Sequence, residues 1–123
     1  MDTDKNLTSS HLKYLLAIYE ESQDKIDVSS ARVAERLNVS KPSVSSMLTA
    51  LMNRELLVKE RYGKIYLTDT GFLIAKDLFR NIEAVKQELA RMPFQLSEQE
   101  LHSMAAIIVT EMSDRQFADE LTA

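Results

Sequence analysis

The 123-residue chain contains no cysteine, and it has only two glycines, two prolines and two histidines. Without cysteine there is no disulfide, no thiolate metal site and no cysteine nucleophile, and a reducing compartment is expected. So few glycines and prolines argue against glycine-rich phosphate loops and turn-dense β-sandwiches. No apolar run approaches the roughly 18 residues of a membrane span, and Met1–Ser10 is too polar for a signal peptide. We therefore expect a soluble cytoplasmic protein of one domain, or of one domain with an additional arm.

The charge of the chain is unevenly distributed along the sequence. The net charge is −4 at pH 7, yet the segment from Ser29 to Lys64 carries seven basic and three acidic residues, a net charge of +4. A basic middle between acidic ends can bind a polyanion with one face. Chance variation in charge over so short a segment produces the same asymmetry, so the charge pattern alone is weak evidence for a polyanion partner.

Hydrophobic periodicity predicts a mainly α-helical chain with one small β-hairpin. After a cap at Thr8, Ser9 or Ser10, a first helix should run to about Glu21, and an extended piece is expected at 26–28. Further helices are expected over about 30–37, 41–53, 72–91 and 98–112, strands over 57–61 and 64–68, and a short last helix around Phe117 and Leu121.

Several residues mark where these elements begin and turn. Ser40 can cap the third helix, and Pro42 lies in its first turn, where a missing N–H costs little. Tyr62 and Gly63 are expected to form a two-residue turn between the strands. Ser97 and Glu100 have the spacing of a capping box for the last long helix.

This order of elements predicts a winged helix-turn-helix domain over 8–70, followed by a helical dimerisation region over 71–123. The third helix has an outer face of small hydroxyl side chains, which can enter the major groove of DNA. The hairpin carries cations that can contact phosphates. Arg54 could pair with Glu55 or Asp69, but a phosphate contact is slightly favoured. The candidate DNA-binding residues are Ser40, Lys41, Pro42, Ser43, Ser45, Ser46, Thr49, Arg54, Arg61 and Lys64.

The sequence resembles the metal-dependent repressors of the DtxR/MntR type over roughly residues 8–80. The segments that carry the resemblance are HLKYLLAIYEE (11–21), 28–37, VSKPSVSSML (39–48), LLVKE (56–60) and IYLTDTG (65–71). The resemblance implies a homodimeric transcriptional regulator, of the repressor type, that binds a pseudo-palindromic operator. It places the candidate residues from Ser40 to Thr49 on the helix that reads DNA.

The metal site of that family does not carry over to this sequence. Its members have an Asp and a Glu three residues apart on the first helix, where this chain has Lys13 and Leu16. A family histidine should fall near 80–82, where the chain has Arg, Asn and Ile. Divalent manganese or iron needs several converging carboxylate and imidazole donors. We therefore predict no metal cofactor at the family site and leave the effector open.

The apolar residues of the fourth helix follow an a/d heptad spacing from Ala75 to Met92. This seam could pack on the winged domain, but a helix of about 20 residues spans about 30 Å and should project beyond it. We therefore favour dimerisation. The predicted dimer contacts are Leu78, Ile82, Val85, Leu89 and Ile108.

Two alternatives to a metal-family repressor remain open. The C-terminal third, with its QLSEQEL segment (95–101), also resembles MarR-type regulators, which implies a response to small molecules. The winged fold can also serve as a protein-interaction module without DNA binding. An enzyme is not expected, because the sequence shows no Ser-His-Asp set, phosphate loop or metal motif.

Overall fold

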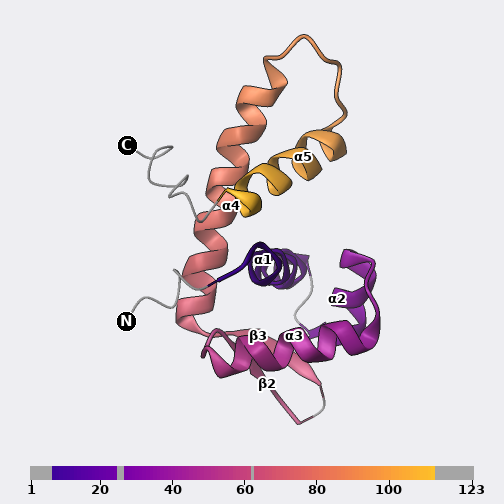
Figure 1. Cartoon of the computed structure of the whole chain (residues 1–123), viewed down its shortest axis with the longest axis vertical. Helices are drawn as coiled ribbons and strands as arrows, with labels where there is room; N and C mark the ends of the chain where they lie inside the picture. Colours follow the sequence, from indigo (N-terminus) through magenta and orange to yellow (C-terminus); the bar gives the residue numbers. More distant parts are fainter. Residues whose placement is uncertain (1–6, 25–26, 62, 113–123) are drawn as a thin grey trace.

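The computed structural model describes residues 7–24, 27–61 and 63–112 of the chain. Five helices and three short strands occur in these residues (Figure 1). Their order is α1 (Ser9–Asp24), β1 (Val28–Ser29), α2 (Ser30–Leu37), α3 (Lys41–Asn53), β2 (Leu57–Lys59), β3 (Lys64–Leu67), α4 (Asp69–Ala90) and α5 (Glu98–Glu111). The predicted fold class is confirmed. The turn residue Tyr62 and the predicted last helix, with Phe117 and Leu121, lie outside the described residues.

The hairpin belongs to a three-stranded antiparallel sheet with the order β1-β3-β2. Val28 pairs with Ile65, so the predicted extended piece becomes an edge strand. β2 ends at Lys59, two residues earlier than predicted, and residues 60–63 connect it to β3. Gly63 has a φ of 87°, which favours glycine, and the Glu60 N–H donates to the Lys64 carbonyl oxygen over 2.8 Å. The connection is therefore longer than the predicted two-residue turn.

Side-chain caps fix where the helices begin. Ser29, Ser40 and Thr68 each accept a hydrogen bond from a backbone N–H in the first turn of α2, α3 and α4. Ser97 and Glu100 form the predicted capping box of α5. Asn38 ends α2 in the left-handed region, with a φ of 56°, and turns the chain directly toward α3.

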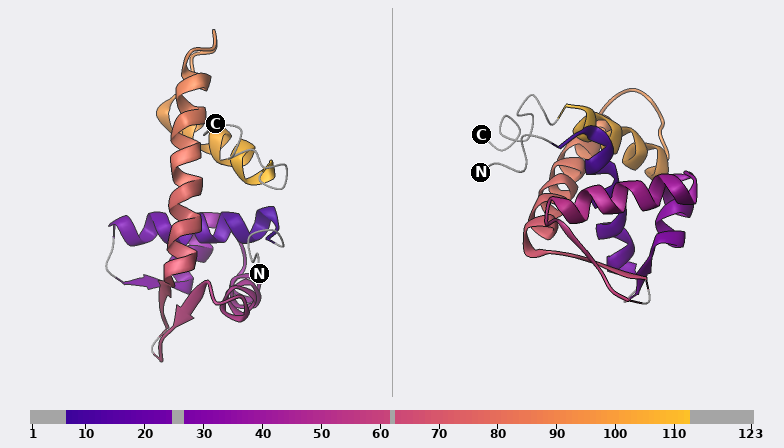
Figure 2. Two further views of the ribbon diagram at one scale, coloured as in Figure 1. Left: turned by 90° about the vertical axis from the view of Figure 1, so that its left-hand side faces the viewer. Right: turned by 60° about the horizontal axis from the view of Figure 1, so that its bottom comes forward.

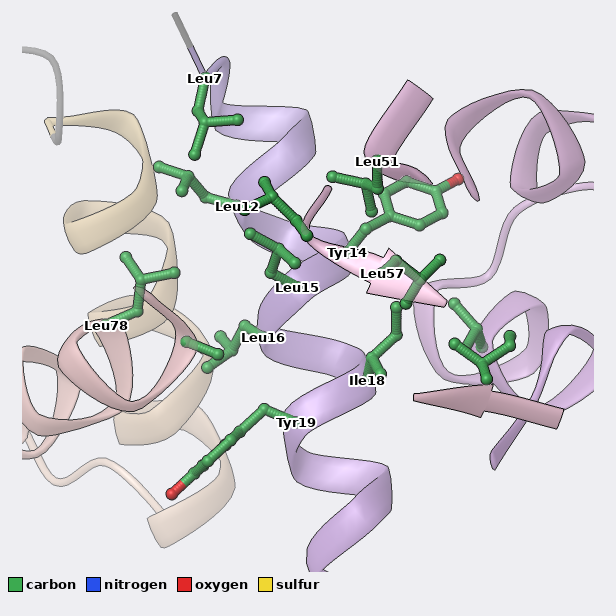
Figure 3. Close-up of a cluster of buried hydrophobic side chains, with 14 of the residues drawn as sticks. Leu7, Leu12, Tyr14, Leu15, Leu16, Ile18, Tyr19, Leu51, Leu57 and Leu78 are labelled. Carbon is green, nitrogen blue, oxygen red and sulfur yellow. The ribbon is translucent and has the colours of Figure 1, made fainter. Parts of the chain in front are cut away.

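One hydrophobic cluster, centred on α1, runs through the described part of the molecule. Figure 3 shows that opposite sides of α1 pack against different elements. Leu16 points toward Leu78 of α4, whereas Ile18 lies on the side of Leu57 of β2. Because α1 packs against both α4 and the helix-turn-helix, the C-terminal helices and the winged domain share this core.

The seam of α4 faces into this core and not toward solvent. Leu78, Ile82 and Val85 are buried, and Leu89 and Ile108 are partly buried against the same cluster. The expectation that this seam meets a second protomer is therefore corrected for the three buried residues. α1 and α5 cover them, because α5 folds back along α4 (Figure 1), and Ala105 and Val109 of α5 are buried in the same cluster.

The start of α4 lies very close to the segment that follows α3. A Cβ atom at Gly71 would lie 2.1 Å from the carbonyl oxygen of Leu56. The Thr68 hydroxyl accepts from the Gly71 N–H and donates to the Glu55 carbonyl oxygen over 2.8 Å. These contacts hold the sheet, the end of α3 and the start of α4 in one arrangement.

The two ends of the molecule differ in what they present. The α4–α5 hairpin projects at one end, and α3 and the hairpin of β2 and β3 lie at the other (Figures 1 and 2).

Among the described helices, none combines the length and the apolar character that crossing a bilayer requires.

Candidate nucleic-acid interface

The candidate DNA-binding residues lie at one end of the molecule, on α3 and on the hairpin beside it (Figure 2). α3 buries Val44, Leu48 and Leu51 and leaves its other face exposed. The exposed residues on that face and its cap are Ser40, Lys41, Pro42, Ser43, Ser45, Ser46 and Thr49. Arg61 and Lys64 of the hairpin are exposed as well. We call this set of residues, together with Arg54, the α3–wing surface.

Some hydroxyl groups of this surface already make hydrogen bonds within the helix. Ser40 accepts from the Ser43 N–H over 3.3 Å and donates to the Ser43 hydroxyl over 2.9 Å. Thr49 donates to the Ser45 carbonyl oxygen over 3.1 Å. A hydroxyl oxygen has two lone pairs, so these side chains remain able to accept hydrogen bonds from a ligand.

The cations of the α3–wing surface differ in exposure and in ion pairing. The Lys64 ammonium lies 3.4 Å from the Asp27 carboxylate, but both side chains are exposed, so this pair is weak and easily exchanged for a phosphate. Arg54 is half-buried at the end of α3 and forms no ion pair with a described carboxylate, so neither predicted partner, Glu55 nor Asp69, holds it. Lys59 is also exposed, at the end of β2.

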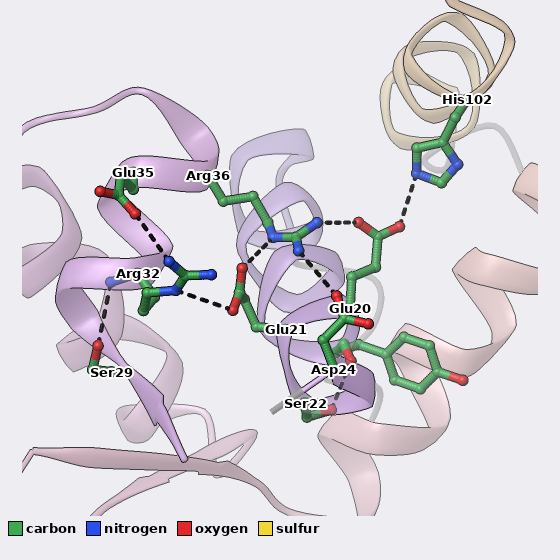
Figure 4. Close-up of polar contacts among 10 residues, drawn as sticks. Glu20, Glu21, Ser22, Asp24, Ser29, Arg32, Glu35, Arg36 and His102 are labelled. Carbon is green, nitrogen blue, oxygen red and sulfur yellow. Dashed lines mark hydrogen bonds and ion pairs between the residues drawn. The ribbon is translucent and has the colours of Figure 1, made fainter. Parts of the chain in front are cut away.

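Two basic residues of the basic segment are instead tied to α1 (Figure 4). Glu21 is 3% exposed, and its carboxylate accepts from Arg36 over 2.8 Å and pairs with Arg32 over 3.6 Å. Arg36 also reaches Glu20 over 3.1 Å and Asp24 over 3.7 Å. The hydrogen bond from Arg36 lowers the pKa of Glu21, although burial alone would raise it. Arg32 and Arg36 therefore anchor α2, and the cations left for a polyanion are those on α3 and the hairpin.

The positions of the family metal site do not fit a divalent cation. The Lys13 ammonium pairs with Glu111 over 3.4 Å, and Leu16 is buried in the core. Arg80 pairs with Asp77, while Asn81 and Ile82 are buried. In the described part of the chain, no group of three or more His, Asp and Glu residues is placed to hold a metal ion.

The Glu98 and His102 side chains do not converge on one site. Glu98 pairs with Lys86 of α4, whereas His102 lies 2.9 Å from Glu20 of α1 (Figure 4). The two side chains thus attach α5 to two different helices, because α5 folds back across both.

The order of elements and the exposed α3–wing surface together define a winged helix-turn-helix domain. Residues 6–65 match the family model described as "Iron dependent repressor, N-terminal DNA binding domain". The resemblance to metal-dependent repressors is thus confirmed for the N-terminal half of the chain. No curated protein sequence matches significantly.

Solved structures support the same assignment. The chain is similar to the manganese regulator SloR, with 29% identity and a TM-score of 0.71, and to the metal-dependent transcriptional regulator MtsR, with 28% identity and a TM-score of 0.73. Each match covers 90% of this chain and 51% of the other, so the chain spans about half the length of these relatives.

A second type of regulator is also similar to this chain. MepR, a transcription regulator of the Staphylococcus aureus multidrug efflux pump MepA, matches with 25% identity and a TM-score of 0.54, covering 90% of this chain and 81% of MepR. This likeness agrees with the predicted resemblance to MarR-type regulators.

Proposed function

We propose that this chain is a DNA-binding transcriptional regulator of the repressor type, acting in the cytoplasm as a homodimer on a pseudo-palindromic operator. The observation that carries the proposal is that the small polar face of α3 and the cations of the hairpin are exposed at the same end of the molecule. The match of residues 6–65 to a DNA-binding domain supports it. Serine and threonine hydroxyls would contact base edges, and Lys41, Arg54, Arg61 and Lys64 would contact phosphates.

Selection of bound duplexes from a random pool, followed by titration at two salt concentrations, tests DNA binding. Affinity should fall steeply between about 50 and 200 mM salt, because cations that contact phosphates release counterions. Lys41→Ala and Arg61→Ala should each reduce the salt dependence, whereas Ser43→Ala should relax preference at particular bases. Arg91→Ala, at the far end of α4, is the matched control and should leave binding unchanged. An affinity that does not respond to salt would contradict the proposal and favour a protein-interaction module.

The homodimer needs a surface other than the buried seam. Beyond the winged domain, α5 exposes Met104 and Ile107 one helical turn apart, with Ile107 56% exposed, and the α4–α5 connection exposes Phe94. Apolar side chains gathered on a projecting hairpin are typical of an interface. We propose that a second copy of the chain covers them, because a two-fold pair joined at this end keeps both α3–wing surfaces free for two half-sites about 34–36 Å apart.

Sedimentation of the purified chain tests the dimer. Ile107→Glu should yield monomers, since it places a charge in the proposed interface, and it should weaken operator binding. Leu73→Glu, at an equally exposed apolar position near the start of α4, is the control and should leave the dimer intact. A wild-type monomer at operator-binding concentrations would refute this part of the proposal.

We further propose that metal at the family positions does not switch this regulator. The support is the chemistry of Lys13 and Leu16, which offer a cation and a hydrocarbon where carboxylates would be needed. Titration calorimetry with Mn²⁺ should give no stoichiometric binding, and Mn²⁺ should leave DNA affinity unchanged. Stoichiometric binding at micromolar concentration that alters DNA affinity would overturn this part.

A further inference from the structure

His11 closes the N-terminal cap of α1, the helix at the centre of the core. The Thr8 side-chain oxygen accepts from the His11 N–H over 3.2 Å, and the Thr8 N–H donates to the His11 Nδ1 over 2.9 Å. This is the reciprocal pattern of a capping box, with an imidazole in the place of the usual Glu or Gln. Leu7 and Leu12 flank the cap and are both buried (Figure 3), as in a hydrophobic staple.

The cap requires a neutral imidazole. Nδ1 lies 2.9 Å from the Thr8 backbone nitrogen and 3.1 Å from the Thr8 hydroxyl oxygen, and it can accept the Thr8 N–H only while it carries no proton. A protonated ring would also sit in the first turn of a helix, where the macrodipole disfavours cations. His11 is buried, and Arg54 at the end of α3 adds a repulsive positive charge. Burial, and then Arg54, lower the pKa of His11. Among the described side chains, no carboxylate pairs with the ring to offset these effects.

We propose that the Thr8–His11 cap is an acid-sensitive latch, which opens the first turn of α1 when Nδ1 takes up a proton. Opening breaks both reciprocal hydrogen bonds and frees Leu7 and Leu12 from the core. Because Arg54 belongs to the α3–wing surface, a ligand bound at that surface can change the protonation of His11. A phosphate bound at Arg54 offsets the charge that repels a proton at His11, so DNA binding and proton uptake at His11 assist each other. This second consequence rests on the proposed function.

Hydrogen exchange of the Leu12 amide measures the latch directly, since this N–H donates to the Thr8 carbonyl oxygen over 3.1 Å. If opening follows uptake of one proton, the protection factor should fall by up to about tenfold per pH unit below roughly pH 6.5. His11→Gln is the matched variant, because Gln at this position completes an ordinary capping box without titrating in this range. Its protection should not change between pH 7 and pH 5.

The second histidine provides the control, because the chain has only His11 and His102. His102→Gln should retain the fall in Leu12 protection. A flat profile in the wild type, a fall that persists in His11→Gln, or a fall that disappears in His102→Gln would each overturn the latch.

Calorimetry of DNA binding in two buffers of different ionisation enthalpy tests the coupling to Arg54. Near pH 6, the wild type should take up protons on binding and His11→Gln should take up measurably fewer. Equal uptake in both proteins would refute the coupling. If no duplex binds at all, the proposed function fails, whereas the exchange experiment still decides whether the latch exists.

Discussion

Replacing Arg36 with methionine tests how the buried carboxylate of Glu21 is stabilised. The substitution keeps much of the side-chain volume and removes the donor that lies 2.8 Å from Glu21. Glu21 would then remain buried with Arg32 alone, at 3.6 Å. Removing one partner of a fully buried ion pair costs about 3–5 kcal/mol. The Arg36 side chain is 32% exposed, so we expect a loss of about 2–3 kcal/mol, the reduced value reflecting solvent screening.

Urea denaturation followed by circular dichroism at pH 7 measures this loss. Arg80→Met is the matched control, since Arg80 pairs with Asp77 over 2.8 Å on the surface and should contribute less than about 0.5 kcal/mol. Adding Glu21→Leu to Arg36→Met should restore part of the stability, because the buried carboxylate is then gone. If Arg36→Met costs no more than the surface control, the buried pair does not hold α2 in place.

The pH dependence supplies an independent check on the same pair. The folded-state pKa of Glu21 is lowered from 4.5. Its contribution to stability is therefore fully present above pH 4.5 and is lost as the pH falls through the lowered pKa. Arg36→Met removes the main cause of that lowering, so the stability difference between the two proteins should shrink in acid. A difference that stays constant down to about pH 3 would contradict this assignment.

Two further substitutions test local features of the fold by the same denaturation assay. Gly71→Ala should cost at least about 1–3 kcal/mol, because its Cβ would meet the Leu56 carbonyl oxygen at 2.1 Å. Gly63→Ala, whose Cβ meets nothing within 4 Å, should cost only about 1 kcal/mol for its positive φ, and equal losses would count against the close contact at Gly71. Ser97→Ala should cost about 1 kcal/mol by removing the hydroxyl that accepts the Glu100 N–H, while the Ser97 backbone N–H can still donate to the Glu100 carboxylate, and an unchanged stability would mean that α5 does not depend on this cap.

Local signals in the sequence predicted the local structure well. Ser40 and Ser97 cap helices where their spacing indicated, because a cap depends only on residues within one turn. The exposed face of α3 was also predictable, since its small polar residues alternate with a regular apolar stripe.

Features that depend on the path of the chain in space were not predictable from these patterns. The heptad spacing of α4 shows that one side is apolar, but not whether α5 or a second protomer covers it. The basic segment did not reveal that Arg32 and Arg36 face Glu21, which precedes them on α1 by 11 and 15 residues. The Thr8-x-x-His11 spacing was visible, but a capping box usually has Glu or Gln at that place.

The continuous length of α4 gives the molecule a lever. Its 22 residues extend about 33 Å, and it begins at Asp69, separated only by its cap, Thr68, from the last strand of the wing. Rotating this rod by about 5° about its base would carry the far end through about 3 Å. A small change in the angle of the wing therefore produces a large displacement of the α4–α5 hairpin. Conversely, a partner that holds the hairpin in place fixes the angle of the wing closely.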